Sequence, residues 1–173
     1  MRADGVRSKT MRSALGDRDV EALDFPNCAY KATVPVEPMN YDPAVSHPMT
    51  DVNRNLWVNH QRYIMAYPIR NGSLYNLVLP YLGKASVGKW DKPGDPEEMK
   101  NHYKNWDPTI RRVLGHITSC SKWKLAYLPL LKRWTSDNGR ALLIGDVAHA
   151  MFPYMAQGAA ASIKDGSAMA EML

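Results

Sequence analysis

The sequence predicts a mixed α+β or α/β fold built around a central sheet, either mixed or antiparallel. One observation is the strand-like alternation of residues 28–37. A second is a pair of apolar segments, residues 62–70 and 74–81, joined by Asn71-Gly72. This dipeptide favours a hairpin because both residues tolerate positive φ. In residues 28–37 the apolar side chains share one face and the polar ones the other: Tyr30, Ala32, Val34 and Val36 against Lys31 and Thr33.

A third observation is a series of helix and strand signals after residue 95. Pro96 followed by two glutamates predicts a helix start, because proline suits the first turn and acidic residues suit the positive end of the helix dipole. Trp106-Asp107-Pro108 ends this helix and begins another that extends to about residue 115, with Asp107 as N-cap. Residues 122–127 are predicted as a strand, and residues 141–145 as a short buried strand.

Other segments are predicted as connections. Residues 17–23 are polar and loosely helical, and Phe25-Pro26-Asn27 should end them as a turn. Residues 38–55 hold three prolines, so we expect a surface excursion with helical fragments. Residues 87–90 are interpreted as a short strand and residues 91–95 as a turn.

Composition and charge disfavour several classes of protein. With 45% hydrophobic and 23% charged residues, the 173-residue chain is typical of a globular domain. The net charge is +5, and the Lys and Arg residues are scattered along the chain, which favours a solvated surface over nucleic-acid binding. Cys28 and Cys120 lie far apart, so we predict neither a metal site nor a disulfide framework. No apolar stretch approaches the roughly 20 residues of a membrane helix, and we predict a cytoplasmic protein.

The last 35 residues carry the chemistry. A short apolar segment ends in Gly145-Asp146, a loop is closed by Pro153, and a helix of small residues begins near Gly158. The free N–H groups and the dipole of such a helix start can receive an anion or a polarised ring. A carboxylate at a strand end, Asp146, suits a pair of ribose hydroxyls. These features predict a nucleotide cofactor.

This region also resembles a known motif. The spacing is Gly145-Asp146-x-Ala148-His149-x-x-x-Pro153-x-x-Ala156-Gln157-Gly158-Ala159-Ala160, followed by Lys164-Asp165-Gly166. It resembles the second FAD-binding motif of class A flavoprotein monooxygenases, most closely the fungal salicylate-hydroxylase-like branch. Near the other end, Asp4-Gly5 resembles the family's Asp-Gly segment, which serves flavin and NAD(P)H binding. Three segments between these two motifs follow the order of the family's middle region: residues 67–76, Trp106-Asp107-Pro108 and Trp123-Lys124-Leu125. The resemblance therefore covers nearly the whole chain.

The resemblance implies FAD as cofactor and assigns roles to several residues. Asp146 would accept hydrogen bonds from the ribose, and Pro153 would border the reactive edge of the flavin. Backbone N–H groups at Gly158, Ala159 and Ala160 would face the pyrimidine edge, although small residues there also suit close helix packing. The full set of expected cofactor-binding residues is Asp4, Gly5, Arg12, Gly145, Asp146, Pro153, Gly158, Ala159 and Ala160.

Two positions depart from the family pattern. The Arg expected seven residues after Asp4 is Met11 here, and Arg12 or Arg7 is the candidate substitute. The branch often carries His-x-x-x-Tyr-Pro beneath the substrate, where this chain has Tyr63-x-x-x-Tyr67-Pro68. Residues four apart on a strand share a face, so both phenols could line one substrate cavity, or both could belong to the sheet core. His149 is interpreted as structural.

The predicted function is FAD-dependent monooxygenation: hydroxylation of an aromatic or related small molecule with NADH or NADPH and O₂. Catalytic candidates are Tyr67, Tyr63 and Pro153. Residues 1–25 would end one FAD-binding part, 26–130 would form the substrate domain, and 131–173 the second FAD-binding part. The family's Gly-x-Gly-x-x-Gly turn is absent, so we interpret the chain as an internal fragment. The alternative is an inactive remnant with weak or no flavin binding, acting at most as an interaction module.

Overall fold

A computed structural model describes residues 3–6, 8, 11, 15–16, 23–50, 53–60, 62–83 and 91–172. Contacts divide the chain into two units, Pro26–Lys124 and Met1–Phe25 with Leu125–Leu173, which we describe separately. The elements of the first unit, with the strands that continue beyond it, are β1 (Leu23–Pro35), η1 (Glu37–Met39), α2 (Pro43–Thr50), β2 (Asn55–Asn59), β3 (Arg62–Ile69), β4 (Leu74–Leu82), β5 (Asp91–Gly94), α3 (Pro96–His102), α4 (Pro108–Gly115) and β6 (Cys120–Tyr127). The other unit holds α5 (Asp146–His149), η2 (Pro153–Met155) and α6 (Gly158–Met172).

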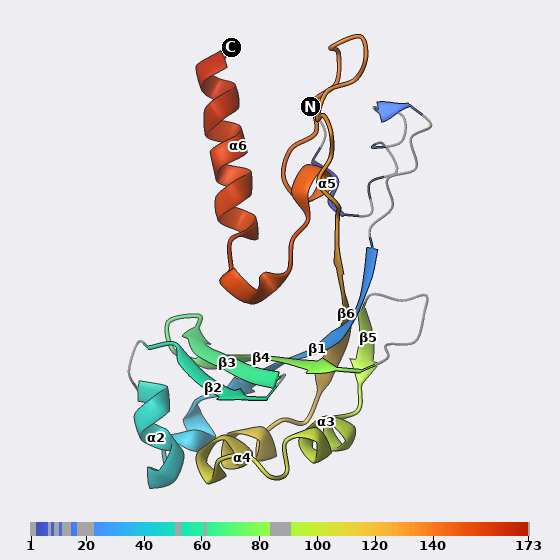
Figure 1. The fold of residues 1–173 in the computed structure, drawn as a ribbon. Helices are drawn as coiled ribbons and strands as arrows, with labels where there is room; N and C mark the ends of the chain where they lie inside the picture. The colour runs from blue at the N-terminus through green and yellow to red at the C-terminus, as the bar shows by residue number, and fades with distance from the viewer. Residues whose placement is uncertain are drawn as a thin grey trace. The chain divides into compact units, whose positions relative to one another are not determined.

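A six-stranded sheet in the order β2-β3-β4-β1-β6-β5 forms the centre of the first unit. The β1–β4, β2–β3, β3–β4 and β5–β6 pairs are antiparallel. Helices α2, α3 and α4 lie on one side of the sheet in Figure 1. The core includes the predicted inward side chains of β1, Tyr30, Ala32 and Val34, together with Met99 of α3 and Ile110 of α4. The predicted α+β class and the alternation of β1 are confirmed.

The hairpin and both helix starts also follow the sequence prediction. Residues Arg70, Asn71 and Gly72 take positive φ between β3 and β4, and the Gly72 N–H donates to the Ile69 carbonyl at 3.1 Å. Asp95 caps α3 by accepting from the Glu97 N–H at 2.9 Å. Asp107 caps α4 by accepting from the N–H groups of residues 109 and 110. These local signals were sufficient because each depends on only a few neighbouring residues.

Two predictions about connections were wrong, and one strand was missed. The predicted turn at Phe25-Pro26-Asn27 is part of β1, because pairing with β4 extends to Asn27, opposite Leu82. The predicted turn at 91–95 contains the edge strand β5, where Pro93 is tolerated because an edge leaves some N–H positions unpaired. Strand β2 was not anticipated. The predicted helical residues 17–22 and the predicted strand 87–90 lie outside the described residues.

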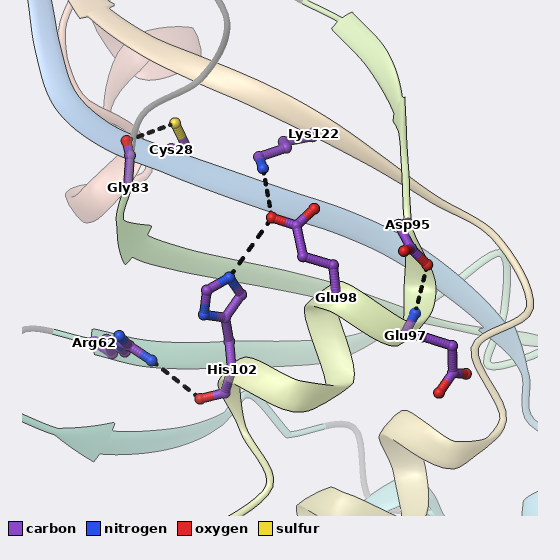
Figure 2. A network of polar contacts seen from close by, with 8 residues as sticks. All are labelled: Cys28, Arg62, Gly83, Asp95, Glu97, Glu98, His102 and Lys122. Carbon is purple, nitrogen blue, oxygen red and sulfur yellow. Dashed lines mark hydrogen bonds and ion pairs between the residues drawn. The ribbon is translucent and has the colours of Figure 1, made fainter.

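A polar network ties α3 to the sheet (Figure 2). Glu98 accepts from Lys122 Nζ of β6 at 2.9 Å, and its Oε1 lies 3.8 Å from His102 Nε2. Arg62 of β3 donates to the His102 carbonyl at 3.0 Å. The hydrogen bond from Lys122 holds the pKa of Glu98 below its ordinary value, and burial lowers the pKa of His102. Glu98 therefore fastens a helix to a strand through side chains.

Within the described residues, no helix combines the length and the apolar character needed to span a membrane.

Candidate functional site

The turn at Gly145-Asp146 requires glycine at its first position. Gly145 has φ 66° and ψ −149°, a region that side-chain-bearing residues rarely adopt. A Cβ at this position would also lie 3.0 Å from Ser162 Oγ of α6. Asp146 follows as the first residue of α5, and its side chain is exposed. The backbone thus presents one carboxylate outward from a buried turn.

The segment before this turn is extended but is not a regular strand. Thr135 and Leu142 form an isolated bridge, and the fully buried Leu143 donates its N–H to the Trp134 carbonyl at 2.8 Å. The prediction of a strand at 141–145 was therefore only partly right. A short pairing segment gives burial without a full ladder of hydrogen bonds.

Asp165 of α6 holds both ends of the turn region. Its Oδ2 accepts from the Gly145 N–H at 2.7 Å and lies 2.6 Å from His149 Nε2. The two side chains are mostly buried, at 13% exposure for Asp165 and 17% for His149. Burial raises the pKa of Asp165, but the Gly145 N–H and His149 bring it below its ordinary value. The contact gives His149, which the sequence analysis interpreted as structural, a partner on α6.

The start of α6 has backbone donors that the helix itself does not satisfy. Pro153 begins η2, Ala156 has a left-handed backbone, and the Gln157 carbonyl accepts from the Ala161 N–H at 2.8 Å. The three preceding N–H groups, of Gly158, Ala159 and Ala160, therefore have no acceptor within the helix. Asp146 Oδ1 lies 3.8 Å from the position of a Cβ at Gly158. The carboxylate and the helix start meet at one place.

A cavity of about 280 Å³ lies beside this turn. It is lined by residues of both predicted cofactor motifs and of α6: Ala3, Gly5, Ile144, Gly145, Asp146 and Ser162. Gly5 has φ 84°, and Asp4 accepts from Ser8 Oγ at 2.7 Å, which stabilises the loop that contains Gly5. The structure thus brings Gly5 and Asp146 together from opposite ends of the chain. Arg12 and Arg7 lie outside the described residues.

Tyr63 and Tyr67 lie on the sheet of the other unit. Their neighbours on β3, Ile64 and Ala66, are fully buried on the helix-covered face. Both tyrosines therefore lie on the opposite face and are only partly buried. The register aligns Tyr67 with Asn76 of β4, and Asn76 with Thr33 of β1. A polar row thus crosses three strands beside Tyr67.

Ser162 was missed as a site residue, and Asp165 was included in the motif but was given no role. Both follow Gly158 on α6 at spacings of four and seven residues, which places all three on one helix face. That periodicity was available in the sequence. What the sequence does not reveal is that this face meets the Gly145-Asp146 turn.

Comparison with known proteins identifies the family. The chain belongs to the family described as "FAD binding domain", whose model matches residues 2–173. FAD-dependent monooxygenase OpS4 of Beauveria bassiana is 31% identical over 171 residues, covering 99% of this chain and 40% of that protein. The 3-hydroxybenzoate 6-hydroxylase of Klebsiella oxytoca is 29% identical over 170 residues, covering 98% of this chain and 40% of the relative. The chain therefore spans about two fifths of the length of these curated relatives.

A solved structure agrees with this assignment. The salicylate hydroxylase substrate complex matches with a TM-score of 0.85 and 25% identity, covering 99% of this chain and 44% of that one. The predicted resemblance to the aromatic hydroxylases is confirmed.

The residues present fit part of an FAD molecule. A Cβ at Gly158 would reach ordinary contact distance of the Asp146 carboxylate, so glycine keeps the space beside that carboxylate open. An exposed carboxylate for ribose hydroxyls lies beside N–H groups that have no acceptor within α6 and that suit a flavin edge or an anion. The cavity of about 280 Å³ matches one section of a dinucleotide rather than the whole.

Proposed function

We propose that the protein is an FAD-dependent monooxygenase that hydroxylates an aromatic small molecule with NADH or NADPH and O₂. The observation that carries this proposal is the cavity lined by both Gly5 and Asp146, whose carboxylate lies beside the first residue of α6. The family membership and the names of the relatives support the same chemistry. Location in the cytoplasm stays a prediction.

The site residues divide the work of holding the cofactor. Asp146 would accept hydrogen bonds from ribose hydroxyls, as an exposed carboxylate at a rigid turn can do. The N–H groups of Gly158, Ala159 and Ala160 would hold the pyrimidine edge and stabilise negative charge there. Pro153 would border the flavin without adding a backbone donor. Bound FAD would supply electron transfer from NAD(P)H and reaction with O₂.

The sheet face opposite α2, α3 and α4 supplies the substrate-facing residues of this proposal. Tyr67 and Tyr63 lie on that face, and Asn76 and Thr33 continue the row of Tyr67. A phenol at this position can donate a hydrogen bond to an oxygen of the substrate or accept its proton. The relatives named for 3-hydroxybenzoate and salicylate support an aromatic substrate that carries such oxygens.

Tyr67→Phe tests this assignment in the FAD-loaded protein. We expect NAD(P)H oxidation to continue while hydroxylated product per NAD(P)H falls about tenfold and H₂O₂ rises, because the phenol acts on the substrate and not on the flavin. Tyr63→His should retain coupling, since histidine is the residue common at this place in the branch. The matched control is Tyr41→Phe, which removes a hydroxyl from a side chain that is 83% exposed. Unchanged coupling in Tyr67→Phe would return both tyrosines to a structural role. A parent protein that neither consumes NAD(P)H nor forms hydroxylated product would contradict monooxygenation.

A further inference from the structure

One oxygen atom connects three parts of the site unit. Asp165 Oδ2 accepts from the backbone N–H of Gly145 at 2.7 Å and lies 2.6 Å from Nε2 of His149. Gly145 ends the extended segment, His149 ends α5, and Asp165 lies within α6. Asp146, the first residue of α5, therefore lies between two points that the same carboxylate fixes.

His149 depends on this contact for its orientation. Its Nδ1 is buried, and within the described part of the chain it has no hydrogen-bond partner. The other ring nitrogen is the one that meets Asp165, while the Trp134 ring packs against the imidazole with centroids 5.2 Å apart. The bond to Asp165 therefore requires the ring proton to be on Nε2 when His149 is neutral.

We propose that Asp165 is a positioning residue that fixes the Gly145-Asp146 turn through the Gly145 N–H and the His149 ring, and so sets the direction of the Asp146 carboxylate. The inference rests on the proposed function only where it concerns the cofactor. Its first part, that Asp165 holds the turn, is independent of any ligand.

The cost of losing this contact falls on the turn itself. Gly145 is buried and has a backbone conformation that side-chain-bearing residues rarely adopt. Without Asp165 its N–H would be buried without an acceptor, and the turn would shift to satisfy it. Such a shift moves the neighbouring Asp146, whose Oδ1 now lies close to Gly158 at the start of α6.

Amide hydrogen exchange measured by NMR tests the first part in the full chain. In Asp165→Ala we expect the Gly145 amide to exchange at least tenfold faster, while the Leu143 amide, bonded to the Trp134 carbonyl at 2.8 Å, stays within about twofold of the parent chain. Glu171→Ala is the matched control, because it removes an exposed acid from the same helix and should leave both amides unchanged. Gly145 exchange within twofold of the parent chain would overturn the proposal.

FAD titration, followed by chemical-shift changes so that weak binding is measurable, tests the second part. Asp165→Ala should weaken FAD binding about tenfold, as Asp146→Ala should, while Glu171→Ala should not change it. If Asp146→Ala weakens binding and Asp165→Ala does not, the positioning role is wrong. If the parent chain binds no FAD, or binds it equally without Asp146, the proposed cofactor role fails and the Gly145 exchange alone decides whether Asp165 holds the turn.

Asp165→Ala could unfold the unit, in which case the Leu143 amide would also exchange faster. The variant Asp165→Asn keeps the test decisive in that case. Asparagine fills the same space and retains one acceptor oxygen but no charge. We expect Gly145 exchange and FAD affinity intermediate between the parent chain and the alanine variant. Values equal to those of the parent chain for both quantities would show that the carboxylate is dispensable.

Discussion

Two helical carboxylates of this molecule make similar contacts with different consequences. Glu98 of α3 shares one oxygen between Lys122 and His102, and Asp165 of α6 shares one oxygen between the Gly145 N–H and His149. Glu98 is 45% exposed, whereas Asp165 is 13% exposed. These contacts of Glu98 are with side chains, whereas Asp165 also contacts the backbone of a turn.

The difference explains where each carboxylate acts. An exposed ion pair between flexible side chains adds little stability, because water competes for both charges. A buried carboxylate that accepts from a backbone N–H restricts the backbone itself and is costly to remove. We therefore expect Glu98 to tune the stability of its unit and the Asp165 region to control the geometry of a site.

The largest stability effect in this comparison should come from Gly145→Ala. Its φ of 66° and the 3.0 Å approach of Ser162 Oγ oppose a Cβ, so we expect a loss of about 1–3 kcal/mol. The free energy of unfolding, taken from native-state exchange at Leu143, measures it. Gly166→Ala is the control and should change stability in the opposite direction. A Cβ at this position meets nothing within 4 Å, and alanine within a helix should raise the free energy of unfolding by up to about 1 kcal/mol. If Gly145→Ala lowered the free energy of unfolding by less than an ordinary surface substitution does, the turn would not be constrained.

A smaller effect should follow Glu98→Gln. The pair with Lys122 is partly exposed, so we expect a loss of about 1 kcal/mol or less, measured by exchange at Leu77 in the centre of the sheet. The folded pKa of Glu98 is lowered, so its contribution is present above the ordinary value of 4.5 and is lost as the pH falls through the folded pKa. Glu97→Gln is the matched control, since Glu97 is 79% exposed and pairs with Lys100 of its own helix. A loss larger than that of Gly145→Ala would reverse the comparison.

The smallest effect should be the pH dependence that His102 contributes. Burial lowers its folded pKa below the ordinary 6.5, so the unfolded chain takes up a proton first as the pH falls. Stability contributed by neutral His102 is present above 6.5 and decreases below it. His102→Gln should therefore flatten the dependence of Leu77 exchange on pH between about pH 7 and pH 5. An unchanged slope would mean that other groups titrate there.

The sequence predicted what depends on short-range chemistry. The caps at Asp95 and Asp107, the Asn71-Gly72 hairpin and the alternation of β1 need only neighbouring residues. The edge strand β5 could not be predicted, because Pro93 next to Gly94 favours a turn until β6 supplies a pairing partner. Asp165 shows the same limit at the site: its spacing from Gly158 was readable, but its contact with Gly145 is created by tertiary packing.

The measurement that tests the central claim most directly is the affinity for FAD of Asp146→Ala beside Glu171→Ala. Both variants remove one exposed acid from the site unit, but only Asp146 lines the cavity with Gly5. We predict that Asp146→Ala binds FAD at least about tenfold more weakly while Leu143 exchange is unchanged, and that Glu171→Ala binds it within about twofold of the parent chain. Equal affinity in all three proteins would contradict the assignment of the Gly145-Asp146 turn as part of an FAD site.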